Sequence, residues 1–246
     1  MWIKDFIYIN KLTLTRSVKA LTKNPALLLL GIIYSFVQIG ATMVLGRIPI
    51  IGGMFLAIIY GMIVSHYFYL LNEVTLGVGK CHIQDVKIAV KMYFFKVYGV
   101  MFFFFIAQLV LGVFFGGNAV IFNVVLILAF ILLNALPETV YQKHYDTLGS
   151  LRYSIDFIKE SYIEWFIPNI IFVFIILGLQ KLQIGISIFN FIPSGMISLN
   201  FSSILFYFIQ QIIFMFVMLY RGMLFNILTT TSKHKRNFDR QMRRNG

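Results

Sequence analysis

The sequence predicts an all-α, polytopic membrane protein with six transmembrane helices and cytoplasmic amphipathic helices before spans one, three and five. Hydrophobic residues make up 59% of the 246 residues, and charged residues only 12%. In a soluble domain about 45–50% of the residues are apolar and about 25% are charged. The mean hydropathy is +0.85. This composition excludes a soluble domain, a disordered chain and a coiled coil. The single cysteine, Cys81, excludes an internal disulfide.

Six mostly apolar stretches are long enough to cross a bilayer, which takes about 20 residues. The expected spans cover residues 25–45, 48–72, 97–115, 119–137, 164–182 and 201–227. Gly116, Gly117 and Asn118 separate the third span from the fourth, because these residue types favour tight turns. Residues 183–200 carry Gly, Ser, Asn and Pro193, so we expect a loop or an interfacial segment there. The spans lack the alternation of barrel strands, which leaves helices as the expected structure.

Basic residues gather on one side of the expected spans. Eighteen of the 21 Lys and Arg residues lie in the N-terminal segment, the 2–3 and 4–5 connections and the tail, and only Arg47 and Lys181 lie opposite. Because cytoplasmic loops carry the excess of basic residues, we expect both termini to be cytoplasmic in the cell membrane. The first twenty residues alternate apolar and basic side chains, so the first span is the expected targeting signal. We expect one transmembrane domain, residues 1–230, and a basic cytoplasmic tail, residues 231–246.

Each segment before an odd-numbered span shows apolar residues at helical spacing. The stripes are Leu14, Val18 and Leu21 in the first segment, Ile83, Val86, Val90, Tyr93 and Val97 in the second, and Leu148, Leu151, Ile155, Ile158, Tyr162 and Trp165 in the third. Arg152 and Lys159 fall on the opposite face of the third helix. The pattern indicates three units of amphipathic helix, span, outer turn and span. It is either a true repeat or the ordinary consequence of six spans with short outer loops.

Short motifs along most of the chain resemble those of a known group of proteins. They are Arg16-Ser17-Val18-Lys19-Ala20-Leu21 with Lys23-Asn24-Pro25, Gly79-Lys80 with Gln84-Asp85, Pro137-Glu138, Leu148-Gly149-Ser150-Leu151-Arg152-Tyr153-Ser154, Ile158-Lys159 and Trp165. The chain resembles uncharacterised bacterial six-span membrane proteins, a group that includes the membrane domain of some glycerophosphodiester phosphodiesterases. The resemblance implies a six-helix fold in the cytoplasmic membrane and implies no catalytic residues. No part of the chain remains to encode the soluble phosphodiesterase domain, so that activity is not expected.

The sequence shows no motif for enzymatic, metal or cofactor chemistry. The four histidines form no HExxH zinc pair, and no two carboxylates share a span as an acid–base pair. Pro193-Ser194-Gly195 continues with Met196 instead of the histidine of the lipid-phosphatase signature. We therefore expect no catalytic residue, no metal and no cofactor.

Polar residues inside the expected spans are the candidate functional residues, because such groups are costly in a bilayer. They are Gln38, His66, Gln108, Asn123, Asn134, Gln210, Gln211 and Arg221. One hypothesis is a polar path through the bundle, built from Gln210, Gln211, Gln108, Asn123 and His66. The alternative is that the amides form interhelical hydrogen bonds, each worth about 0.6 kcal/mol.

Arg221 lies inside the last expected span, near its cytoplasmic end. Glu138 and Glu73 lie near the same end of spans four and two, so either carboxylate could pair with the guanidinium, and the candidate ion pair is Arg221 with Glu138. In the alternative, Arg221 reaches the interface alone by extending its side chain.

The tail is a dense basic run. Its candidate contacts to anionic lipid are Lys233, Lys235, Arg236, Arg243 and Arg244. The same residues would also serve as a stop signal that holds the last span in place. The run has no aromatic platform for stacking bases, so a specific nucleic-acid partner is not expected.

The sequence thus favours a non-enzymatic integral membrane protein, an accessory or membrane-homeostasis factor. Its expected partners are the lipid bilayer, anionic lipids within it, or another membrane protein. The alternative is a transporter or permease subunit for a small or lipid-like solute, which a polar path near the midplane would serve. An intramembrane enzyme would need a site that no sequence motif reveals.

Overall fold

The computed structural model describes residues 2–48, 51–77, 86–115, 118–178 and 201–231. Within these ranges the regular elements are helices, which agrees with the predicted all-α class. They are α1 (Trp2–Lys23), α2 (Ala26–Leu45), α3 (Ile51–Leu76), α4 (Val86–Phe115), α5 (Ala119–Leu132), α6 (Leu136–Gln142), α7 (Thr147–Gly178) and α8 (Phe201–Thr230).

Five stretches of the described residues are long and apolar enough to cross a membrane. They are Ala26–Leu45, Ile51–Leu76, Lys87–Phe115, Val120–Gln142 and Phe208–Thr230. The chain is therefore a multi-pass membrane protein. These stretches correspond to five of the six predicted spans. The remaining predicted span, 164–182, begins inside α7, and its last residues lie outside the described part of the chain.

The fourth predicted span, 119–137, does not form one continuous helix. Helix α5 ends at Leu132, and α6 begins at Leu136 with Pro137 in its first turn. Proline has no N–H to donate to the carbonyl four residues earlier, and its ring clashes with that carbonyl, which here belongs to Leu133. The prolyl ring thus accounts for the interruption that the span assignment missed.

Two predicted amphipathic segments continue into the spans that follow them. Helix α4 runs from Val86 through the predicted boundary at Val97 without a break. Helix α7 also joins the third amphipathic segment to the fifth predicted span, but Ser161 has non-helical dihedral angles (φ −126°, ψ 23°) and kinks it there. The kink lies three residues before residue 164, where the fifth predicted span begins, and seven residues before Pro168.

Helix α1 packs against α8, but not through the stripe that the sequence suggested. Leu14 and Val18 are each 47% exposed. Thr13 and Ser17, with small polar side chains, are buried, and each hydroxyl donates to the backbone carbonyl four residues earlier. Small residues allow helices in a membrane protein to approach closely, which explains why this face and not the larger apolar one meets α8.

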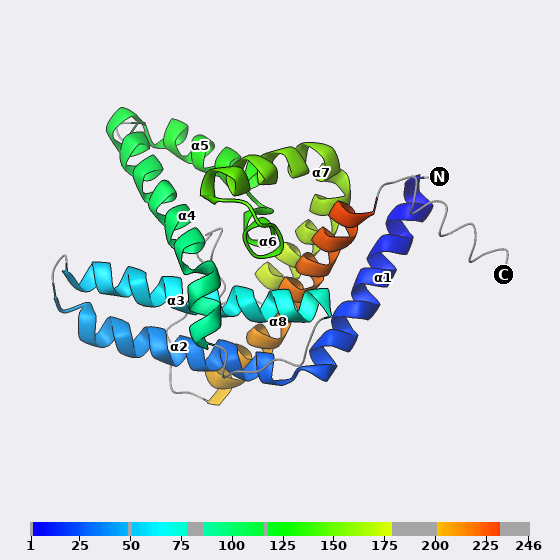
Figure 1. Ribbon diagram of the computed structural model, residues 1–246, viewed down its shortest axis with the longest axis horizontal. Coiled ribbons are helices and arrows are strands. Elements are labelled where there is room, and N and C mark those ends of the chain that lie inside the picture. The colour runs from blue at the N-terminus through cyan, green and yellow to red at the C-terminus, as the bar shows by residue number, and fades with distance from the viewer. Residues whose placement is uncertain (1, 49–50, 78–85, 116–117, 179–200, 232–246) are drawn as a thin grey trace.

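The core lies where α2, α3, α4, α6 and α8 meet. Leu27, Phe68, Leu71, Val97 and Leu219 are among its fully buried side chains. Figure 1 shows α2 and α3 running side by side, whereas α4 and α5 meet at a corner away from α1 and diverge from it, α4 toward α3 and α5 toward α7. A smaller cluster of buried side chains lies between α7 and α8 and contains Trp165 and Phe225. It adjoins the polar site described next.

Candidate functional site

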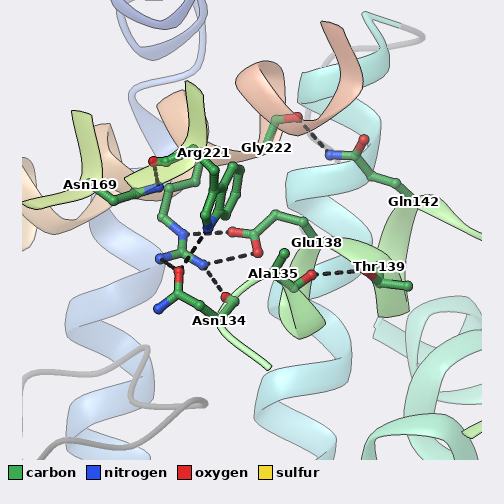
Figure 2. A network of polar contacts seen from close by, with 9 residues as sticks. Asn134, Ala135, Glu138, Thr139, Gln142, Asn169, Arg221 and Gly222 are labelled. Atoms are coloured by element: carbon green, nitrogen blue, oxygen red, sulfur yellow. Dashed lines mark hydrogen bonds and ion pairs between the residues drawn. The ribbon is translucent and has the colours of Figure 1, made fainter. Parts of the chain in front are cut away.

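The interruption between α5 and α6 places two polar residues against α8. Asn134 lies in the interruption, and Glu138 lies in the first turn of α6. Both side chains point toward Arg221 of α8 (Figure 2). Because Arg221 is separated from Glu138 by 83 residues, the pair joins two distant parts of the chain.

Arg221 binds the Glu138 carboxylate through two donors. Nε donates to Oε1 over 2.7 Å and Nη2 donates to Oε2 over 3.0 Å. The Glu138 side chain is fully buried, and that of Arg221 is 15% exposed. Such a bidentate, charge-assisted contact is shorter and more directional than a neutral hydrogen bond. Of the two carboxylates considered from sequence, Glu138 is the one that contacts Arg221.

Asn134 accepts two further hydrogen bonds from the guanidinium. Its backbone carbonyl accepts from Nη2 over 2.6 Å, and its side-chain Oδ1 accepts from Nη1 over 3.3 Å. The same Oδ1 accepts from the indole Nε1 of Trp165 over 2.9 Å. The Arg221 Cζ lies 5.0 Å from the centroid of the Trp165 ring, which adds a cation–π contact.

This network is arranged as a structural connection between α6, α7 and α8. Nε, Nη1 and Nη2 of Arg221 all donate to Glu138 or Asn134. Both carboxylate oxygens of Glu138 accept from Arg221. A buried charged pair is stable only when its hydrogen bonds are met in this way, and a pair so fully engaged is poorly suited to transfer protons to a substrate.

The residue after Arg221 brings three helices into close contact. A Cβ atom on Gly222 would lie 2.4 Å from Tyr141 Oη and 2.7 Å from Thr75 Cγ2. The Gly222 carbonyl accepts from Gln142 Nε2 over 2.8 Å (Figure 2). The lack of a side chain at Gly222 therefore allows α3 and α6 to approach α8 closely.

A basic cleft lies between α1, the end of α3 and α8. Its volume is about 710 Å³, and its lining includes Arg16, Lys19, Lys23, Thr75, Met223 and Asn226. On α8, Met223 and Asn226 follow Arg221 by two and five residues, which turns them to the other side of the helix. The contacts of Arg221 with Glu138 and Asn134 thus fix the rotation of α8 about its axis, and this rotation turns Met223 and Asn226 toward the cleft.

The structure does not bring the five residues of the predicted polar path together. His66, Gln210 and Gln211 are buried, whereas Gln108 and Asn123 are exposed on α4 and α5. Tyr34 of α2 forms a hydrogen bond with His66 Nδ1. A Cβ atom on Gly31 would lie 2.3 Å from Gln211 Oε1, so that amide packs directly on α2. In these places the buried polar groups join helices.

A second cavity, of about 300 Å³, lies between α2, α3 and α4 and is lined by residues that include Gln38, Thr42 and Tyr60. It shares no lining residue with the basic cleft. Within the described residues, no group of three or more His, Cys, Asp or Glu side chains is placed to hold a metal ion. The predicted lipid contacts Lys233, Lys235, Arg236, Arg243 and Arg244 lie outside the described residues.

Lys143 forms a further polar contact just after α6. Its Nζ donates to Thr229 Oγ1 over 3.2 Å and lies 5.6 Å from the centroid of the Tyr153 ring. Partial burial lowers the pKa of Lys143 below its usual 10.5, because removal of water disfavours the ammonium form. This contact ties the end of α6 to α7 and α8.

Comparisons with known protein families, curated proteins and solved structures found no match to this chain. The resemblance to bacterial six-span membrane proteins therefore remains a prediction that rests on the short motifs alone.

The sequence pointed to Arg221 and Glu138 but not to the roles of Asn134 and Trp165, nor to the basic cleft. In the sequence pattern, Asn134 was a general polar residue of the membrane and Trp165 was part of an apolar stripe. The basic cleft was not predicted, because its cations come from α1 and its walls come from α3 and α8. The spacing of Arg16, Lys19 and Lys23, which places them on one side of a helix, was the available signal.

Proposed function

We propose that this chain is an integral protein of the cell membrane that acts without catalysis, as an accessory or membrane-homeostasis factor. It acts through lipid or protein partners at its cytoplasmic face, where both termini lie. The positive-inside pattern of the sequence supports this orientation.

One observation carries the proposal: α1 is held against α8 yet leaves an apolar stripe exposed. The stripe consists of Ile3, Ile7, Leu14 and Val18, which are 63%, 58%, 47% and 47% exposed. Lys4 and Lys11 are also exposed and flank this stripe on the helix surface. An amphipathic helix with lysines beside its apolar face lies in the membrane interface, with the lysines near anionic head groups. Helix α1 is thus suited to engage lipid at the surface of the bilayer.

The buried polar network supports a role without catalysis. Arg221 and Glu138 are the charged pair deep within the described helices, and both are occupied by contacts that join α6 and α8. This geometry suits a pair that stabilises the folded protein more than a pair that reacts with a substrate.

The described residues favour this role over transport. Gln108 and Asn123 face away from the interior that holds Gln210, Gln211 and His66, and the two cavities have separate linings. A transporter requires a site that opens alternately to the two sides. A reconstituted solute flux that falls when Gln210 and Gln211 are replaced by leucine would favour transport instead.

The test of the proposal measures whether the α1 stripe contacts lipid. In a Cys81→Ser background, single cysteines replace Val18 or, as the matched control on the polar side of α1, Thr15. Each is labelled with an environment-sensitive fluorophore in nanodiscs that contain brominated lipid. We expect bromine to quench the label at position 18 several-fold more than the label at position 15. Equal and low quenching at both positions would contradict the proposal.

A further inference from the structure

The basic cleft lies at an end of the membrane-spanning helices. Lys23 ends α1, Asn24 lies in the short turn before α2, and Thr75, Leu76 and Gly77 lie at the end of α3. Because α2 and α3 each cross the membrane once and follow one another, these two ends lie at the same face of the bilayer. The cleft is therefore at the depth where the apolar core of the bilayer gives way to lipid phosphates.

The charge of the cleft is uniformly positive. Arg16, Lys19 and Lys23 follow one another at spacings of three and four residues, so they form one row along α1. All three side chains are exposed, and none of the described residues that line the cleft is acidic. The row of cations therefore faces a space in which no carboxylate competes for it.

The opposite wall combines apolar and neutral polar groups. Val74, Met223 and Ile227 supply apolar surface, and Thr75 and Asn226 supply hydrogen-bonding groups. A volume of about 710 Å³ lies within the range of sites that bind small molecules, about 300–1,000 Å³. Cations beside apolar surface at the membrane boundary complement a molecule with a phosphate at one end and hydrocarbon at the other.

We propose that the cleft between α1, α3 and α8 binds the phosphate head group of an anionic phospholipid. Arg16, Lys19 and Lys23 bind the phosphate, Thr75 and Asn226 hydrogen-bond the polar head group, and the apolar wall receives the beginning of an acyl chain. This inference rests on the proposed function and gives it a ligand class. The basic tail of the chain has the same sign of charge as the cleft, so the two do not complement each other.

The experiment measures lipid binding to the full-length protein in mild detergent by native mass spectrometry. The probes are dioleoyl phosphatidylglycerol, which is anionic, and dioleoyl phosphatidylcholine, which is zwitterionic. The variant Lys19→Gln with Lys23→Gln removes two cations of the cleft. Its matched control, Lys87→Gln with Lys91→Gln, removes two exposed lysines at the same four-residue spacing on α4.

We expect the cleft variant to bind phosphatidylglycerol about thirtyfold more weakly than the wild type, or about fivefold for each cation removed. The control variant should bind it as the wild type does, and phosphatidylcholine should bind all three proteins weakly. An equal loss in both variants would overturn the proposal, because it would show attraction to diffuse surface charge. Displacement of the lipid by millimolar inorganic phosphate would also overturn it, since the ligand would then be a soluble phosphate.

A second variant tests the site in case the cleft variant does not fold. Asn226→Asp is nearly isosteric and places a carboxylate in the cleft while all three cations remain. Weaker binding of phosphatidylglycerol is expected, and unchanged binding would contradict the site. If the α1 label is quenched by lipid while the cleft and control variants bind phosphatidylglycerol alike, that result rejects the lipid site in the cleft and leaves the proposed function in place. If the α1 label is not quenched, the proposed function fails.

Discussion

Arg221 and Glu138 are 83 residues apart and meet through two hydrogen bonds, of 2.7 and 3.0 Å, inside a membrane protein. The contact depends on the interruption between α5 and α6, which places Glu138 on a short separate helix. Asn134, in the same interruption, accepts two further hydrogen bonds from the guanidinium. A proline in the sequence thus leads to a junction between α6 and α8.

Removal of either charge should destabilise the protein strongly. We expect Glu138→Gln and Arg221→Gln each to cost about 3–5 kcal/mol of unfolding free energy, because each leaves a buried partner without its counter-charge. The double variant should lose far less than the sum of the two. The measurement is a double-mutant cycle on denaturant unfolding in detergent.

The control for that cycle is Asp156→Asn. Asp156 pairs with Lys159 over 3.8 Å, and both side chains are more than half exposed. An exposed pair of this kind contributes about 0–1 kcal/mol. Fully additive losses at Arg221 and Glu138, or a loss no larger than the control, would show that the buried pair is not coupled.

Trp165→Phe should separate the hydrogen bond of the indole from its packing. Phenylalanine keeps an aromatic ring beside Phe157 and Phe225 but cannot donate to Asn134. We expect a loss of about 1–3 kcal/mol, against about 3–5 kcal/mol for Trp165→Ala, which also opens a cavity. Thermal unfolding in detergent compares the two, and equal losses would assign the whole effect to the donor.

Gly222→Ala should destabilise the protein by about 1–3 kcal/mol, because the added methyl group meets Tyr141 and Thr75 closer than van der Waals contact allows. Gly112→Ala is the matched control, since nothing lies within 4 Å of a Cβ atom there. The control should be neutral or slightly stabilising, as alanine favours helices. Tolerance of alanine at both positions would contradict the close approach of α3, α6 and α8.

Lys143 predicts a dependence of stability on pH. Its pKa in the folded protein is lower than the usual 10.5, so folding favours the neutral amine over the ammonium form. The cost is fully present below the folded pKa and disappears as the pH rises toward and above 10.5. The difference in melting temperature between the wild type and Lys143→Met should therefore shift in favour of the wild type as the medium becomes alkaline.

The control for the pH dependence is Lys159→Met, because the Lys159 side chain is 67% exposed. Its difference from the wild type should not follow the same trend. Identical pH dependence of the two variants would show that burial at Lys143 has no measurable effect.

The sequence was enough to predict the helical class and most of the spans, and it named Glu138 as one of two candidate partners of Arg221. A charged residue inside an apolar span is costly unless an opposite charge pairs with it, and Glu138 and Glu73 lay near the same end of the expected spans. The interruption at Leu133 to Ala135 was missed because Asn134 is the one polar residue in an otherwise apolar run, and a lone polar residue does not by itself indicate the end of a helix. Only Pro137, four residues after Leu133, signals the break.

The face of α1 that meets α8 could not be predicted from hydrophobicity. The sequence pattern favoured Leu14 and Val18, but Thr13 and Ser17 are the buried residues. In water the larger apolar side chains would be inside, whereas beside a membrane lipid can cover them and small residues allow the helices to meet. The basic cleft was beyond sequence reasoning because it requires the relative placement of three helices.

We propose that the protein engages anionic lipid at its cytoplasmic face and works without catalysis or transport of its own. The most direct measurement is mild purification of the tagged protein from native membranes, with co-purified lipids and proteins identified and quantified by mass spectrometry. We expect enrichment of an anionic phospholipid over its share of the bulk membrane. A stoichiometric ATPase or permease partner, with lipid retained in bulk proportions, would contradict it.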